Sequence, residues 1–97
     1  MTFKQIYEKA KENNITAWRL MVATEVAEFF ENKEYTLIEE EFEEICCFVY
    51  DWVLSTEATP YEVVENLFII INANRKYQFK HIGRYWNEIT EEMNGMF

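Results

Sequence analysis

The side chains of this chain that could do chemistry are mainly carboxylates, and they are concentrated in its middle. Residues 25–65 contain 13 acidic side chains and one basic side chain, Lys33, so this segment has a net charge of −12. The whole chain of 97 residues carries −9. A field of this sign repels phosphate and attracts basic protein surfaces. We therefore expect a protein partner with a basic surface and no direct binding of nucleic acid.

Two acidic patterns also suit a divalent cation. Glu25 and Glu28 form a Glu-x-x-Glu pattern, and Glu44 lies on the following expected helix. Carboxylates on facing helices can hold Mg²⁺ through oxygen ligands. The stretch 21–31, MVATEVAEFFE, resembles the all-α NTP pyrophosphohydrolases of the MazG type, which pair Glu-x-x-Glu on one helix with Glu-x-x-Asp on the next. The resemblance implies a Mg²⁺-dependent pyrophosphohydrolase as an alternative function. Cys47 stands where the second pattern has its aspartate, so we assign no metal or catalytic residue.

The histidine and the two cysteines add no catalytic signature. His81 has no serine, cysteine or carboxylate at a helical spacing that would make it a general base. Cys46 and Cys47 point about 100° apart on a helix, so a disulfide between them would be strained. With no signal-peptide pattern and no long uncharged apolar run, the chain is expected to be cytoplasmic and to avoid the membrane. We expect a protein that is not an enzyme and that needs no cofactor.

The composition predicts that the carboxylates and the other polar side chains described above lie on helices. Hydrophobic residues make up 49% of the chain and aromatic residues 18%, with only two glycines and one proline. This length suits one acidic helical domain over residues 1–97. Apolar residues recur at spacings of three and four, which is typical of helices packed on a core. We expect an all-α, compact bundle of about five helices, at roughly 2–14, 16–32, 36–54, 59–72 and 78–94.

Local signals place the ends of these helices. Thr59 followed by Pro60 is the strongest start signal, because threonine caps a helix and proline tolerates its first position. Thr36 with Glu39 predicts a second capping box. A short buried strand at 67–71 is the rival interpretation of the fourth helix, since its sequence, LFIII, favours strands. The core-facing stripe of the central helix is expected to contain Phe42, Ile45, Cys46, Val49, Trp52 and Val53.

The carboxylates of the second, third and fourth helices are expected to form one continuous, outward-facing acidic surface, and this surface is the predicted binding site. Tyrosine is enriched at protein interfaces, and six tyrosines are more than a core of this size would satisfy. We expect a non-enzymatic binding or inhibitor protein, acting as a nucleic-acid mimic on the basic groove of a nuclease or another nucleic-acid-handling protein. In general character it is similar to small phage-encoded inhibitors of host defence nucleases, anti-CRISPR proteins among them. The predicted contact residues are Glu28, Glu31, Glu40, Glu43, Glu44, Tyr50 and Asp51.

The C-terminal third supports a further alternative. Tyr85 and Trp86 would pack against another copy if the protein were a small homo-oligomeric accessory domain. The basic patch from Arg75 to Arg84 is interpreted as a solvated face that forms salt bridges with the acidic helices.

Overall fold

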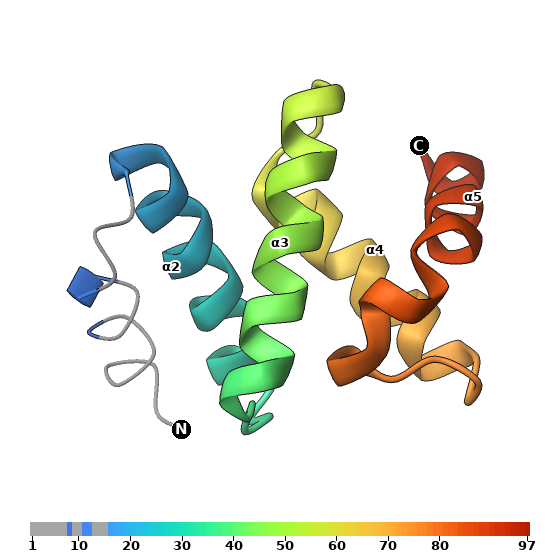
Figure 1. Ribbon diagram of the computed structural model, residues 1–97, viewed down its shortest axis with the longest axis horizontal. Helices are drawn as coiled ribbons and strands as arrows, with labels where there is room; N and C mark the ends of the chain where they lie inside the picture. The colour runs from blue at the N-terminus through green and yellow to red at the C-terminus, as the bar shows by residue number, and fades with distance from the viewer. Residues whose placement is uncertain (1–7, 9–10, 13–15) are drawn as a thin grey trace.

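The computed structural model describes residues 16–97 together with residues 8, 11 and 12, and every regular element in this part is a helix (Figure 1). No strand occurs in this part, so the all-α class is confirmed and the rival strand at 67–71 is excluded. The predicted first helix at 2–14 lies almost wholly outside the described residues. The elements are α2 (Ala17–Asn32), α3 (Glu39–Ser55), α4 (Pro60–Ala73), the 3₁₀ helix η1 (Phe79–Tyr85) and α5 (Trp86–Met96).

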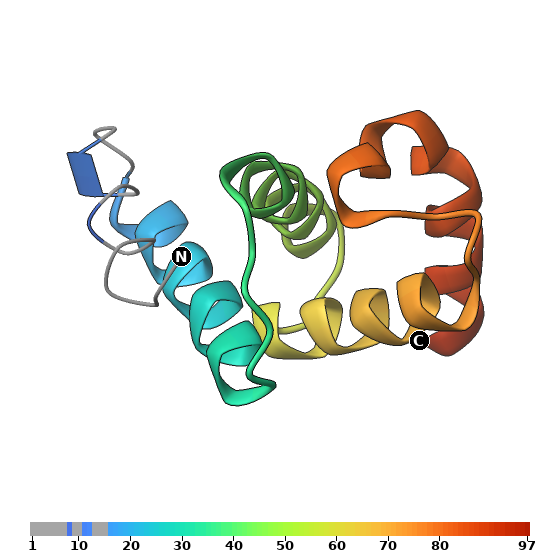
Figure 2. The same ribbon diagram turned by 90° about the horizontal axis from the view of Figure 1, so that it is seen from below.

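Helix α3 lies at the centre of the fold. It packs against α2 on one side and against η1 on the other, and α4 contacts both α2 and α3 as it crosses behind α3 in the view of Figure 1 (Figures 1 and 2). Helix α5 continues from η1 and packs on α4. With neighbours on three sides, α3 keeps one face exposed to solvent, and that face determines what the helix can present to a partner.

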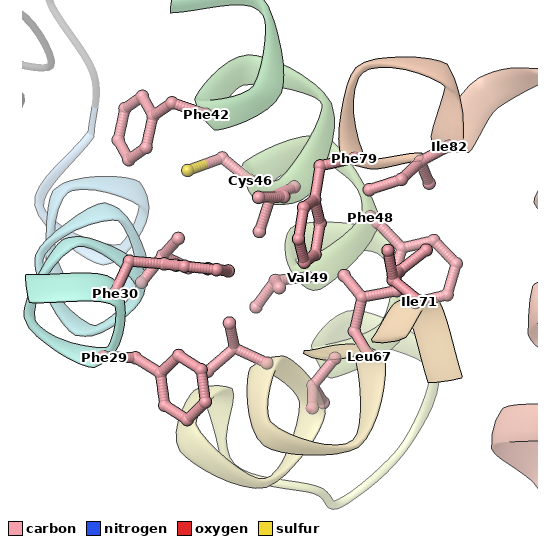
Figure 3. Close-up of a cluster of buried hydrophobic side chains, with 14 of the residues drawn as sticks. Phe29, Phe30, Phe42, Cys46, Phe48, Val49, Leu67, Ile71, Phe79 and Ile82 are labelled. Atoms are coloured by element: carbon pink, nitrogen blue, oxygen red, sulfur yellow. The ribbon is translucent and has the colours of Figure 1, made fainter. Parts of the chain in front are cut away.

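The apolar stripe predicted for α3 forms the middle of the core (Figure 3). Five of its six expected members are buried, and Val53 is half-buried at the edge. Phe48 was missed as a core residue, because it belongs to the side of α3 that packs on the C-terminal elements. The buried side chains of α3 are Phe42, Ile45, Cys46, Phe48, Val49 and Trp52.

A cluster of aromatic rings joins α2 to α4 and η1. Phe30, 1% exposed, is at its centre. Its ring centroid lies 5.6 Å from that of Tyr35, 5.8 Å from that of Phe68 and 5.4 Å from that of Phe79, all in edge-to-face geometry. Edge-to-face pairs add about 0.5–1.5 kcal/mol each beyond the area they bury. The connection after α2 is therefore fixed to the core by Tyr35.

Helix α4 begins at the predicted cap, Thr59, whereas α3 does not begin at the predicted cap, Thr36. The Thr59 hydroxyl accepts from the backbone N–H of Glu62 at 3.2 Å. The predicted box at Thr36 is wrong, because α3 begins two residues after Leu37, which is 1% exposed and needs extended chain to enter the core. The Glu41 carboxylate caps this start by accepting from the Ile38 N–H at 3.0 Å.

The predicted last helix is two elements. The chain forms a 3₁₀ turn up to Tyr85 and an α-helix after it, with a non-helical residue, His81 (φ −121°, ψ 23°), inside the turn. The helix also continues past Asn94 and Gly95 to Met96. Because the chain changes direction between η1 and α5, the apolar side chains of these two elements contact both α3 and α4. The buried ones are Phe79, Ile82, Ile89 and Met93, while Trp86 is half-buried.

Candidate functional site

The exposed face of α3 carries four carboxylates in one stripe. Glu40, Glu43, Glu44 and Asp51, here called the acidic stripe, recur at helical spacings of three, four and seven, so they share the face opposite the buried side chains. Glu40, Glu43 and Asp51 are exposed and Glu44 is half-buried. The stripe extends along most of the helix.

Part of this charge is explained by the helix itself. Glu39, Glu40 and Glu41 occupy the first turn, where the positive end of the helix dipole stabilises carboxylates by about 0.3–1 kcal/mol each. Glu43 and Asp51 lie beyond that turn and receive little of this stabilisation. Their presence on the helix needs another explanation.

The exposed carboxylates of the stripe are not neutralised by the basic residues that the structure describes. None of Glu40, Glu43 and Asp51 has a basic nitrogen of those residues within 4.0 Å. Lys33 instead lies over the rings of Phe29, at 5.5 Å, and Phe68, at 5.7 Å.

The basic patch is likewise not paired with the acidic helices. Lys76 Nζ lies 3.9 Å from Glu88 Oε2, both in the C-terminal third. For Arg75, Lys80 and Arg84, the described carboxylates offer no partner within 4.0 Å. The expected salt bridges from this patch to the acidic helices are therefore wrong for residues 16–97, because the only such pair there is local.

Glu44 has a structural contact of its own. Its Oε2 accepts a hydrogen bond from the backbone N–H of Gly83 at 3.1 Å, which fixes η1 to α3. A Cβ at position 83 would lie 3.3 Å from the same oxygen, so glycine permits this approach. Glu44 thus contributes charge to the stripe, but its carboxylate is less free to reorient toward a partner than those of Glu40, Glu43 and Asp51.

Cys47 lies in the middle of the stripe and is exposed. Partial burial and then the negative charge of Glu44 raise the pKa of its thiol, while Arg19 opposes the shift. The neighbouring Cys46 is buried, and burial raises its pKa further. The raised pKa values lower the thiolate fraction of both residues at neutral pH, which slows the reaction of the exposed Cys47, while burial shields Cys46.

Tyr50, a predicted contact residue, joins α3 to α2. Its hydroxyl donates to the backbone oxygen of Arg19 at 3.2 Å. Its ring lies 5.7 Å from that of Trp18, and the Arg19 guanidinium lies 5.4 Å from the ring centroid. Burial and then Cys46 raise the pKa of the Tyr50 hydroxyl. Tyr50 is half-buried at the edge of the exposed face, with its polar atom already bonded.

Glu28 and Glu31 are exposed on α2, whereas the acidic stripe belongs to α3. Both α2 and α3 turn their apolar sides to the core that they share with α4. The predicted contact carboxylates therefore belong to two groups, one on each helix. The stripe on α3 is the denser of the two.

The carboxylates suggested by the MazG resemblance are not brought into one site. Glu25 and Glu28 lie on α2, whereas Glu44 is bonded to η1 on the other side of α3. The described residues contain no group of three or more histidine, cysteine, aspartate or glutamate side chains that could hold a metal ion.

Tyr85 and Trp86, which were expected to contact another copy of the protein, pack against aromatic rings of their own chain. The Tyr85 ring lies 5.3 Å from that of Tyr77, and the Trp86 ring lies 5.0 Å from that of Phe48. Both Tyr85 and Trp86 remain half-buried.

A small hollow between the C-terminal half of α3 and α5 was not anticipated from the sequence. It has a volume of about 260 Å³ and includes Asp51, the last member of the stripe, in its wall. Trp52 and Thr90 also line it, and each has a buried polar atom without a hydrogen-bond partner. No local sequence pattern could have identified this pair, because they lie far apart in the chain.

Among the described helices, none combines the length and the hydropathy that a membrane span requires. Comparison of the chain with models of protein families, with curated proteins and with solved structures found no match.

Proposed function

We propose that this protein is a non-enzymatic binding protein that docks through the acidic stripe of α3 onto a basic surface of a partner protein. The observation that carries the proposal is the exposure of Glu40, Glu43 and Asp51 on one helix face without a basic neighbour among the described residues. Unpaired charges of one sign on a rigid element steer a partner of opposite charge and speed its association.

The charge density of the stripe supports a nucleic-acid-binding surface as the target. Glu40 and Asp51 are eleven positions apart, which is about 16 Å along a helix. Glu40, Glu43 and Glu44 lie within about 6 Å along the axis and Asp51 lies about 10 Å further, whereas each strand of duplex DNA carries one charge per ~3.4 Å. The stripe therefore resembles a short stretch of one phosphate backbone in sign and length, with its charge concentrated at the start of α3. The proposed activity is inhibition of a nuclease or another nucleic-acid-handling protein by competition for that groove.

The experiment is affinity capture with two baits: the native chain and a variant carrying Glu40→Gln, Glu43→Gln and Asp51→Asn. These substitutions keep shape and helix while they remove charge. We expect a basic nucleic-acid-handling protein to be retained by the native bait and lost from the variant.

The captured protein is then purified and tested for competition with its nucleic acid. Displacement of the nucleic acid by the native chain supports mimicry. If the native and variant baits retain the same proteins equally, the docking proposal is rejected. If the partner binds this protein and its nucleic acid at the same time, docking stands and mimicry is rejected.

A further inference from the structure

The hollow between α3 and α5 has the composition of a binding slot. Its walls include the aromatic rings of Phe48, Trp52 and Trp86 and the polar side chains of Asp51, Thr90 and Asn94. The lining residues contain no lysine, arginine or histidine. Asp51 therefore gives the slot a negative rim, and the rings give it flat apolar walls.

Two buried polar atoms in these walls have no partner. Trp52 is 7% exposed, and its Nε1–H makes no hydrogen bond. The Thr90 hydroxyl oxygen is buried in the same way. Leaving such groups unpaired destabilises a fold, so native proteins rarely keep them without a reason.

The other hydroxyls near the slot are satisfied. Ser55 donates to the backbone oxygen of Asp51 at 2.5 Å, and Thr56 donates to that of Trp52 at 2.9 Å. The unmet hydrogen-bonding capacity is thus confined to Trp52 and Thr90, one on each of the two helices that form the slot.

The size and chemistry of the slot define what fits. Its 260 Å³ far exceeds the ~30 Å³ share of one water and lies below the ~300–1,000 Å³ of pockets for drug-sized ligands. An occupant must offer an acceptor to the Trp52 N–H, a donor to the Thr90 hydroxyl oxygen, a positive charge to Asp51 and a flat group to Trp86. One arginine residue of a peptide meets these needs through its backbone carbonyl and its guanidinium. Lysine lacks the planar group that stacks on an aromatic ring.

We propose that this slot receives a single arginine of the basic partner. The inference rests on the proposed docking function and specifies its anchor, since Asp51 belongs to both the stripe and the slot. The guanidinium stacks on Trp86, pairs with Asp51 and donates to the Thr90 hydroxyl oxygen, while the arginine carbonyl accepts from Trp52 Nε1. Less than 1 Å² of that nitrogen is accessible in the free protein, so the side chains that cover it must move on binding. Arginine and tryptophan are both enriched among the few residues that carry most of the binding energy of an interface.

A blocked glycine–arginine–glycine tripeptide tests the slot without the partner. The three tryptophan indole N–H signals are followed by NMR during titration and assigned with single tryptophan-to-phenylalanine variants. We expect the signals of Trp52 and Trp86 to shift and saturate, while that of Trp18, on α2, stays unchanged. A matched tripeptide with neutral citrulline in place of arginine should bind about five- to tenfold more weakly. No saturable shift, equal shifts of all three signals, or equal binding of the citrulline peptide would each overturn the proposal.

Thr90→Val separates a binding role from a structural one. Valine has nearly the shape of threonine and removes the unpaired hydroxyl, so the variant should melt at a higher temperature and bind the arginine peptide more weakly. A lower melting temperature would show that Thr90 serves the fold and would overturn its role in the slot.

The captured partner then distinguishes the slot from the stripe. If neutralising Glu40 and Glu43 weakens partner binding but Thr90→Val and Asp51→Asn do not, the slot proposal fails and docking stands. If the tripeptide binds as expected while no basic partner is captured, the slot stands and the docking function fails.

Discussion

Glu43→Gln should stabilise the free protein if the stripe is unpaired as described. Glu43 is exposed beyond the first turn of α3, and Glu40, another exposed carboxylate of the stripe, precedes it at a spacing of three. Like charges at this helical spacing destabilise by about 0.2–0.5 kcal/mol per pair. Removing the charge should therefore raise the free energy of unfolding by about 0.2–0.5 kcal/mol. For a domain of this size that corresponds to an increase in Tm of roughly 1–4 °C.

The assay is thermal unfolding followed by circular dichroism at low salt and again at 1 M salt, where the Debye length falls to about 3 Å. The gain should shrink strongly at high salt. Glu44→Gln is the matched control on the same face, because it also removes a charge but weakens the hydrogen bond from Gly83. It should give no gain or a small loss. A lower Tm for Glu43→Gln, or a gain that persists at 1 M salt, would refute the unpaired stripe.

Other substitutions test the core, one turn and the thiols. Phe30→Ala should cost about 3–5 kcal/mol in unfolding free energy by denaturant titration, because it empties the centre of the ring cluster; a loss below ~1 kcal/mol would contradict that packing. Glu34→Gly should stabilise by about 0.5–1 kcal/mol relative to Glu34→Ala, since Glu34 has a φ of 56° that glycine adopts without strain; equal stabilities would count against this conformation. With a maleimide at pH 7, Cys47 should react more slowly than a free thiol and accelerate as the pH rises, whereas Cys46 should react only on unfolding. Fast modification of Cys46 in the folded Cys47→Ser variant would contradict the burial of Cys46.

The parts of the fold that follow from local chemistry were predictable from the sequence. Thr59 and Pro60 specify a helix start through backbone geometry alone. The stripe of Phe42, Ile45 and Val49 predicts the buried side of α3 because a helix repeats every 3.6 residues. The same period placed the carboxylates on the opposite side.

The features that the sequence did not reveal depend on contacts between distant residues. The Glu44–Gly83 hydrogen bond joins residues 39 positions apart, and it accompanies the 3₁₀ turn that splits the predicted last helix. The left-handed conformation of Glu34 has no signal, since glutamate is an unusual residue there. Trp52 and Thr90 form one slot only because α5 packs beside the end of α3.

The salt dependence of partner binding tests the docking account most directly. The dissociation constant of the purified complex is measured across a range from low to physiological salt, for the native chain and for the variant with Glu40→Gln, Glu43→Gln and Asp51→Asn. Docking through the stripe predicts that native binding weakens steeply with salt, and that the variant binds more weakly with a shallower dependence. Binding that is indifferent to salt, or identical for the two proteins, would contradict it.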